Sequence, residues 1–271
     1  MALMERIGDA EGRELGAVRA PGGVLLSYER YGTGPPLVLV HGSFSDHRSN
    51  WEFVAPSLAK EFTVYAIARR GRGGSDATGG HGVADEARDV AAVIDSIGEP
   101  VFLIGHSYGA QVALAAAAER PDQVRKLILY EPPRPDTAEA LGSQFESLAD
   151  SGDWDGVATS FFRLALSVPE SELQSLRKSD LWPPIVADAK PTLGDIRAMT
   201  AYDFRPERFR SLAMPIMLQI GTESPAGAFA TDALAEVLSD VRIEPLPGQA
   251  HEGMTTAPEQ YVDSVRRYLL S

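Results

Sequence analysis

Residues 101–120 read VFLIGHSYGAQVALAAAAER, an apolar run of strand length that passes through the glycine-flanked GHSYG into an alanine-rich helical stretch. The pattern G-x-S-x-G has mechanistic meaning when it lies between a strand and a helix, as it does here. Its two glycines allow a turn sharp enough to expose the hydroxyl of Ser107, and the following helix points its positive end at the site. Alone, the pattern also fits a glycine-rich turn, but its flanks favour a nucleophilic serine.

Further apolar runs of strand length repeat the character of residues 101–107. They lie at 36–42, 62–68, 126–132, 215–221 and 241–247. Helical periods separate them, at 51–58, 90–97 and 262–269, and a hairpin pattern precedes them at 16–32. Runs that are apolar on both faces indicate strands buried between helices. We therefore expect an α/β fold with a mostly parallel central sheet, helices on both faces, and a ligand site at the carboxyl ends of the strands.

The alternation of strand and helix stops between residues 134 and 206, where only helical patterns follow one another. An insertion of this kind after one strand of an open sheet resembles a lid over the strand ends. We expect residues 1–133 and 207–271 to form one core and 134–206 a helical cap. The cap carries five large aromatic residues: Phe145, Trp154, Phe161, Phe162 and Trp182. Each one is typical of cap core, and together they favour an apolar pocket.

The composition excludes several classes of function. The 271 residues include 25 basic and 38 acidic side chains, and the formal net charge of −13 disfavours nucleic acid or an anionic membrane as a partner. With no cysteine, a thiol nucleophile and thiolate metal sites are excluded. The first residues carry mixed charges instead of the apolar stretch of a signal peptide, and no apolar run reaches about 18 residues. We expect a cytoplasmic protein.

A serine hydroxyl needs a neighbouring base, and histidine is the usual one. The chain has five histidines: His41, His47, His81, His106 and His251. His106 lies inside the turn and should point away from the hydroxyl, whereas His41 is typical of a histidine that holds loop backbone. His47 and His81 lie in polar stretches and are expected to be solvated. His251 follows the last predicted strand in a glycine-containing loop that can reach Ser107, and it is our candidate base.

The tetrahedral intermediate of acyl transfer requires hydrogen-bond donors for its oxyanion. We expect one donor to be the backbone N–H of Tyr108, the residue after the nucleophile. The other should come from the glycine turn after 36–40, where Ser43 is the first choice and Phe44 the second.

With these elements in order, the chain resembles the α/β-hydrolase superfamily over nearly its whole length. Five segments carry the resemblance: HGSFSDHRSNW at 41–51, RRGRGGSD at 69–76, GHSYG at 105–109, YEPP at 130–133 and LPGQAHEGM at 246–254. It implies the α/β-hydrolase fold, with residues 134–206 as the family's helical cap. Relatives commonly place an acid in a G-x-x-D pattern after the strand that here reads PIMLQIG. This chain has Gly221-Thr222-Glu223-Ser224 there, with serine at the acid position and Glu223 one residue early.

Three carboxylates are candidates for the acid that orients the histidine. Glu131 ends the strand 126–132, a position from which certain haloalkane dehalogenases and zearalenone-type lactone hydrolases draw their acid, and it is the first choice. Glu223 is the second choice, and Asp232 is a further possibility. The simpler alternative for Glu131 is a polar strand end capped by solvent, and for Glu223 a solvated turn residue.

The sequence thus predicts a serine hydrolase that cleaves a hydrophobic ester or lactone through an acyl-enzyme, without metal or organic cofactor. Ser107 would attack, His251 would transfer protons and Glu131 would orient the histidine. A serine at the nucleophile position disfavours the dehalogenase and epoxide hydrolase relatives, which use a carboxylate. Perhydrolysis, C–C bond cleavage and a slow ligand receptor with the same triad remain alternatives. A purely structural role fits poorly, and both monomer and homodimer are compatible with the sequence.

Overall fold

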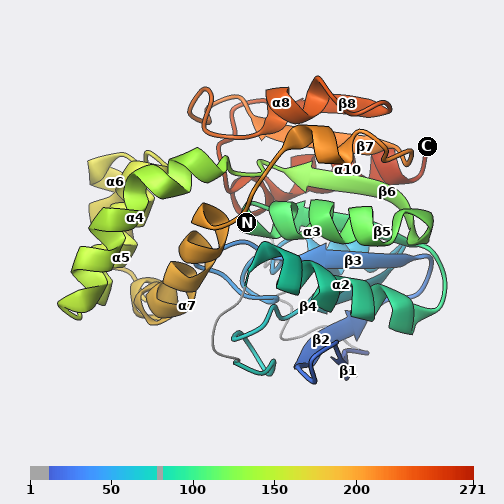
Figure 1. The fold of residues 1–271 in the computed structure, drawn as a ribbon, viewed down its shortest axis with the longest axis horizontal. Helices are drawn as coiled ribbons and strands as arrows, with labels where there is room; N and C mark the ends of the chain where they lie inside the picture. The colour runs from blue at the N-terminus through green and yellow to red at the C-terminus, as the bar shows by residue number, and fades with distance from the viewer. Residues whose placement is uncertain (1–11, 78–81) are drawn as a thin grey trace.

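The computed structural model describes residues 12–77 and 82–271, and its strands form one sheet in the order β1-β2-β4-β3-β5-β6-β7-β8 (Figure 1). The strands are β1 (Glu14–Arg19), β2 (Leu25–Tyr31), β3 (Pro36–Val40), β4 (Thr63–Ile67), β5 (Val101–His106), β6 (Val124–Tyr130), β7 (Ile216–Gly221) and β8 (Val241–Leu246). β2 pairs antiparallel with β1 and β4, and all remaining neighbours are parallel. The predicted hairpin and the mostly parallel sheet are confirmed.

The central strands are buried on both faces, because helices cover each side of the sheet. Every residue of β3 and of β5 is buried. Helices α2 (Val83–Ile97) and α3 (Tyr108–Glu119) pack on one face, where Val38 and Val40 belong to their hydrophobic cluster. Helix α10 (Pro258–Leu269) packs on the other face with Leu37 and Leu39. The alternation along β3 therefore assigns successive side chains to the two layers.

The predicted helical period at 51–58 forms only the short helix α1 (Ala55–Leu58), preceded by turns. Pro56 stands in the first turn of α1, because a proline deeper inside a helix would remove a backbone hydrogen bond and clash with the preceding turn. Trp51 and Val54 are nevertheless fully buried. The apolar spacing identified core residues correctly and overestimated the helix.

The chain between β6 and β7 is helical and lies beside the strand ends, at the left of Figure 1. It consists of α4 (Pro135–Asp150), α5 (Trp154–Ser160), the π-helical turn η3 (Phe161–Ala165), α6 (Glu170–Leu176) and α7 (Trp182–Thr200). Ala158, Leu173 and Trp182 form a small hydrophobic cluster within this segment. Phe145 and Ile196 instead join the cluster on the α2/α3 face of the sheet. The segment therefore has a core of its own and also packs on the sheet.

The remaining helices are short: η2 (Pro121–Gln123), η4 (Pro206–Phe209), α8 (Thr231–Ala235) and α9 (Gly253–Thr256). Among residues 12–77 and 82–271, no helix combines the length and the apolar character needed to cross a bilayer. The loops that leave β3, β5, β6, β7 and β8 all carry predicted site residues.

Candidate active site

Ser107 stands at the turn between β5 and α3 in a strained backbone conformation. Its φ of 54° and ψ of −126° lie where a residue with a Cβ rarely stays, at a cost of about 1–3 kcal/mol. The flanking glycines are required by close backbone contact: a Cβ on Gly105 would lie 2.6 Å from Ala110 Cα, and one on Gly109 would lie 2.3 Å from the His41 carbonyl oxygen. The backbone of α3 thus packs directly on β5 and β3, and this packing holds the strained serine.

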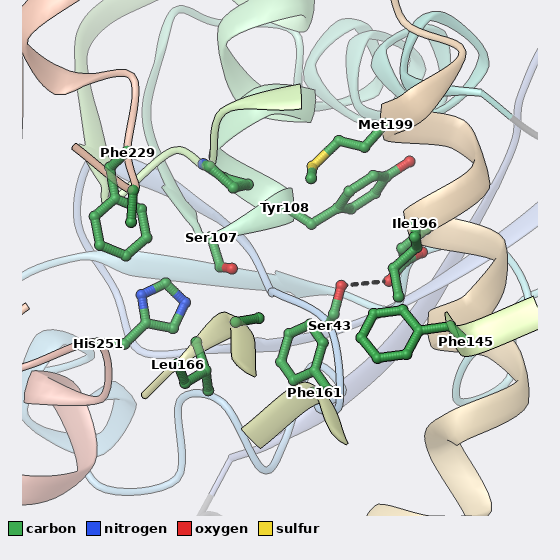
Figure 2. Close-up of a pocket in the computed structure, with 14 residues that line it drawn as sticks. Ser43, Ser107, Tyr108, Phe145, Phe161, Leu166, Ile196, Met199, Phe229 and His251 are labelled. Carbon is green, nitrogen blue, oxygen red and sulfur yellow. Dashed lines mark hydrogen bonds between the residues drawn. The ribbon is translucent and has the colours of Figure 1, made fainter. Parts of the chain in front are cut away.

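His251 lies beside Ser107 in the wall of a pocket (Figure 2). It follows β8 in the loop before α9, and its ring stacks on Phe229 at 5.2 Å between centroids with an interplanar angle of 5°. His251 Nδ1 is 2.6 Å from Oε2 of Glu131. That hydrogen bond places the proton on Nδ1 and leaves Nε2 as the nitrogen that can accept a proton from a neighbouring hydroxyl.

Glu131 is fully buried directly after β6, with a φ of 48°. Its Oε1 accepts hydrogen bonds from the Gly221 backbone N–H at 2.7 Å and from the Ser224 hydroxyl at 2.5 Å, while Oε2 faces His251. Three donors therefore hold the carboxylate, two from the end of β7 and the turn after it and one from the loop after β8. Ser224, the residue at the position where relatives commonly carry their acid, contributes one of them.

The other two candidate acids lie elsewhere. Glu223 is exposed, and its Oε1 accepts from Thr222 Oγ1 at 3.3 Å. Asp232 is exposed on α8. The structure therefore brings Ser107, His251 and Glu131 together and leaves Glu223 and Asp232 at the surface.

Burial and Glu131 act on the pKa of His251 in opposite directions. Burial alone would lower the pKa of His251, but the hydrogen bond and the charge of Glu131 outweigh it and raise the pKa above its ordinary value. A raised pKa makes the imidazole a stronger base, which suits proton transfer from a hydroxyl.

The two residues predicted to donate to the oxyanion lie in the wall of the same pocket as Ser107. Ser43, in the loop after β3, and Tyr108, the first residue of α3, both line the pocket (Figure 2). Neither amide donates a hydrogen bond to any group within 12–77 and 82–271. The amide of Phe44, in contrast, donates to Thr192 Oγ1 at 3.0 Å. Of the two predicted alternatives, Ser43 has the available N–H.

The pocket is small and mainly apolar, with a cavity volume of about 60 Å³. Its apolar wall consists of Pro133, Phe145, Phe161, Ala165, Leu166, Ile196, Met199, Ala228 and Phe229. Phe145 and Phe161 are two of the five aromatic residues singled out in the sequence. Phe162 and Trp182 pack in the helical segment's own core, and Trp154 packs against the larger cluster. The aromatic residues therefore divide between pocket wall and core.

Asp195 of α7 also lines the pocket, and the sequence did not reveal it. Arg69 and Arg72 bind its carboxylate, with Arg69 Nη2 at 2.9 Å and Arg72 Nη2 at 2.8 Å from Oδ2. All three side chains are almost fully buried. The only signal was the arginine-rich stretch RRGRGGSD, since buried arginines require carboxylate partners.

The remaining histidines have structural surroundings. His41 Nδ1 donates to the Gly42 carbonyl oxygen at 2.8 Å, and its Nε2 accepts from the Arg69 N–H at 3.2 Å, so this histidine does hold loop backbone. The prediction that His47 is solvated is wrong: it is 6% exposed, and its Nε2 lies 3.7 Å from the buried Glu29. The loop folds over this carboxylate and over Gly73, where a Cβ would lie 2.7 Å from His47 Cε1. His81 lies outside the described residues.

His106, His251 and Glu252 bring possible metal-ligand atoms within 4.8 Å of one another. Three of the four ring nitrogens already have partners. His251 Nδ1 faces Glu131, His106 Nε2 lies 3.0 Å from the His251 carbonyl oxygen, and His106 Nδ1 lies 3.1 Å from Asn50 Oδ1. This arrangement supports the loop that carries His251 better than it would support a cation.

A strand, a strained serine turn and a helix, with a histidine and a carboxylate delivered by later strands, define an α/β enzyme of the hydrolase class. The model of the alpha/beta hydrolase family matches residues 37–264, and the chain belongs to that family.

Relatives and solved structures extend this result. A pyrrolizixenacetamide deacetylase from Xenorhabdus hominickii is 36% identical over 113 residues, 40% of this chain and 41% of that protein. A pimeloyl-[acyl-carrier protein] methyl ester esterase from Nitrosomonas europaea is 28% identical over 255 residues, 88% of this chain and 96% of that protein. The crystal structure of an alpha/beta hydrolase from Sphaerobacter thermophilus is 29% identical, has a TM-score of 0.78, and covers 94% of this chain and 100% of its own.

Proposed function

We propose that the protein is a serine hydrolase that cleaves a carboxylic ester or lactone of a hydrophobic small molecule through an acyl-enzyme. The observation that carries the proposal is the buried hydrogen bond between Glu131 and His251 Nδ1. It lies beside Ser107, which has a strained backbone at the N-terminus of α3. A serine has little reactivity alone, and this arrangement supplies the base and the residue that orients it.

In the proposed mechanism, Ser107 Oγ attacks the substrate carbonyl while His251 Nε2 takes its proton. The oxyanion accepts hydrogen bonds from the amides of Ser43 and Tyr108, at the positive end of α3. Protonated His251 then gives its proton to the leaving alkoxide, and Glu131 stabilises the imidazolium meanwhile. A water activated by His251 releases the acid. No metal or organic cofactor takes part in these steps.

The pocket supports an uncharged, hydrophobic substrate. Its wall is apolar, and the carboxylate of Asp195 at its edge is bound by two arginines. We propose that residues 134–206 act as a cap over the core formed by 1–133 and 207–271, because α4, η3 and α7 supply much of this wall. The names of the two relatives, a deacetylase and a methyl ester esterase, agree with hydrolysis at an acyl carbon.

A fluorophosphonate probe tests the nucleophile. We expect one adduct per chain, on the peptide that contains Ser107, and no adduct in Ser107→Ala. Ser107→Ala should also reduce kcat on any ester by on the order of 10⁴-fold or more. Labelling of another residue, or turnover by Ser107→Ala at the wild-type rate, would refute the proposal.

A substrate panel separates the chemistries that one triad can perform. Short aryl and alkyl esters, lactones, vinylogous diketones, and acids with hydrogen peroxide should be assayed with Ser107→Ala as the blank. We expect esters or lactones to give the highest kcat/KM. Faster C–C cleavage or perhydrolysis would reassign the reaction, and turnover equal to the blank would indicate a ligand receptor.

A further inference from the structure

Helix α7 is tied to the loop that carries the Ser43 amide. Asp195, which is 1% exposed, accepts a hydrogen bond from Ser43 Oγ at 2.8 Å. Figure 2 draws this bond as the dashed line at Ser43. One turn earlier on the same helix, the fully buried Thr192 accepts the Phe44 N–H at 3.0 Å. Two successive residues of the loop after β3 therefore bond to a helix that lies about 150 residues further along the chain.

The carboxylate of Asp195 also binds Arg69, and Arg69 in turn binds the carbonyl oxygen of the Gly42–Ser43 peptide. Arg69 Nη2 donates to the Gly42 carbonyl oxygen at 2.9 Å, and His41 Nδ1 donates to it at 2.8 Å. This carbonyl belongs to the peptide bond that carries the Ser43 N–H. In a trans peptide the C=O and N–H point in opposite directions, so donors on the Gly42 oxygen aim the Ser43 N–H away from them.

The same loop packs against Ser107. A Cβ placed on Gly42 would lie 3.0 Å from Ser107 Cβ, so the loop runs directly against the nucleophile. Hydrogen bonding of a carbonyl to a guanidinium also polarises the peptide, which strengthens its N–H as a donor.

Arg69 also contacts the side chain of Tyr108, the residue of the second proposed amide donor. Its guanidinium lies over the Tyr108 ring at 4.6 Å, and Arg69 Nη1 and the Tyr108 hydroxyl both bind Glu86, at 2.9 and 2.7 Å. The side chains that surround both oxyanion amides thus meet at one buried arginine, whose charge is balanced by Glu86 of the core and Asp195 of α7.

We propose that Asp195 and Arg69 are positioning residues that align the oxyanion-binding amide of Ser43, so that the site is complete only when α7 is docked on the core. Asp195 acts on Ser43 directly and on the Gly42–Ser43 peptide through Arg69. The inference rests on the proposed function, since it assigns an origin to the alignment of the oxyanion hole.

Two variants separate this role from folding. Ser43→Ala removes one hydroxyl and keeps both the backbone N–H and the buried ion pairs. Asp195→Asn keeps the side chain's shape and removes its charge from Arg69. Because loss of a whole oxyanion donor costs about 10²–10³ in kcat, misalignment should cost about tenfold in Ser43→Ala and up to about a hundredfold in Asp195→Asn, with KM nearly unchanged.

The diagnostic measurement is the affinity for a trifluoromethyl ketone, which forms an oxyanionic adduct with the serine, compared with the affinity for the product acid. We expect the ketone Ki to rise in proportion to the loss of kcat/KM, while product binding stays constant. Arg197→Gln is the control, because Arg197 lies on α7 but pairs with Glu146 on the exposed side. It should leave kcat and Ki at wild-type values.

Each outcome has a separate meaning. If Ser43→Ala and Asp195→Asn retain wild-type kcat and ketone Ki, α7 does not align the oxyanion hole and the inference is wrong. If Asp195→Asn does not fold, Ser43→Ala decides the question, because it leaves the ion pairs intact. Full turnover by Ser107→Ala would instead refute the proposed function.

Discussion

At the residue scale, the acid position is the most distinctive feature of the site. The family resemblance predicts a carboxylate after the strand that is β7 here, and this chain carries Ser224 at that position. The hydroxyl of Ser224 donates to Glu131, which comes from the end of β6. The serine found after β7 is therefore matched by a carboxylate after β6, and both oxygen atoms of that carboxylate accept hydrogen bonds.

Exchange of each glutamate for glutamine tests this arrangement. Glu131→Gln should lower kcat on the order of 10³–10⁴-fold, because the amide cannot hold His251 in the correct tautomer or stabilise the imidazolium. Glu223→Gln is the matched control at an exposed turn position and should retain wild-type kcat. Steady-state kinetics with thermal melting of both variants decides the question, and the reverse ranking would move the acid to Glu223.

The pH dependence of kcat/KM tests the environment of His251. The imidazole must be neutral to accept the serine proton, so activity falls as the pH drops through its pKa. Because Glu131 raises that pKa, we expect the acid limb of the wild-type profile to lie above the ordinary histidine value of about 6.5. In Glu131→Gln the lowering effect of burial is opposed only by the charge of Glu252, so the limb should move to lower pH. An unchanged limb would contradict the assignment.

The position of a single residue could be predicted from the sequence where its place after a strand was the reason for it. Ser107 and His251 follow from their place after a strand, and the choice of Glu131 over Glu223 agrees with the geometry now observed. Asp195 and Thr192 were not predictable, because they meet Ser43 and Arg69 through the packing of segments far apart in the chain. His47 was misjudged since a polar local sequence does not reveal the buried carboxylate that it covers.

At the element scale, the strand–turn–helix unit depends on backbone contact between α3 and the strands beneath it. The strand runs and the long helices α2 and α10 follow from hydrophobic periodicity, which depends only on the local sequence. The extent of α1 could not be predicted from this periodicity, because Pro56 limits the helix while the apolar spacing continues through the preceding turns.

Two glycine-to-alanine substitutions separate the effect of close backbone contact from the effect of the helix propensity of glycine. Gly109→Ala places a Cβ 2.3 Å from the His41 carbonyl oxygen, so we expect a loss of stability of about 3 kcal/mol together with a displaced serine turn. Gly142→Ala, in helix α4 with no atom within 4 Å of the added Cβ, should stabilise the protein by about 0.5–1 kcal/mol. Chemical denaturation measures both, and equal effects would contradict the contact argument.

At the scale of the whole molecule, the formal charge of −13 should influence which substrates reach the site. A negative field lowers the encounter rate with anions, and the screening length is about 10 Å at 0.1 M salt. We expect kcat/KM for 4-acetoxybenzoate, relative to neutral phenyl acetate, to rise several-fold between 10 mM and 500 mM NaCl. A ratio independent of salt would show that the net charge does not act at the pocket.

The bonds from α7 to the loop after β3 have a consequence for how such a protein can change its substrate. Helical segments over the strand ends are attractive units to exchange between homologous enzymes, because they supply the pocket wall. Here a transplanted segment would also need an acceptor opposite Ser43, another opposite the Phe44 amide and a counterion for Arg69. Chimaeras that retain residues equivalent to Thr192 and Asp195 should therefore keep turnover, whereas those that lack them should bind new ligands and react slowly. In evolution as in engineering, changes in α7 would therefore affect substrate specificity and turnover rate together.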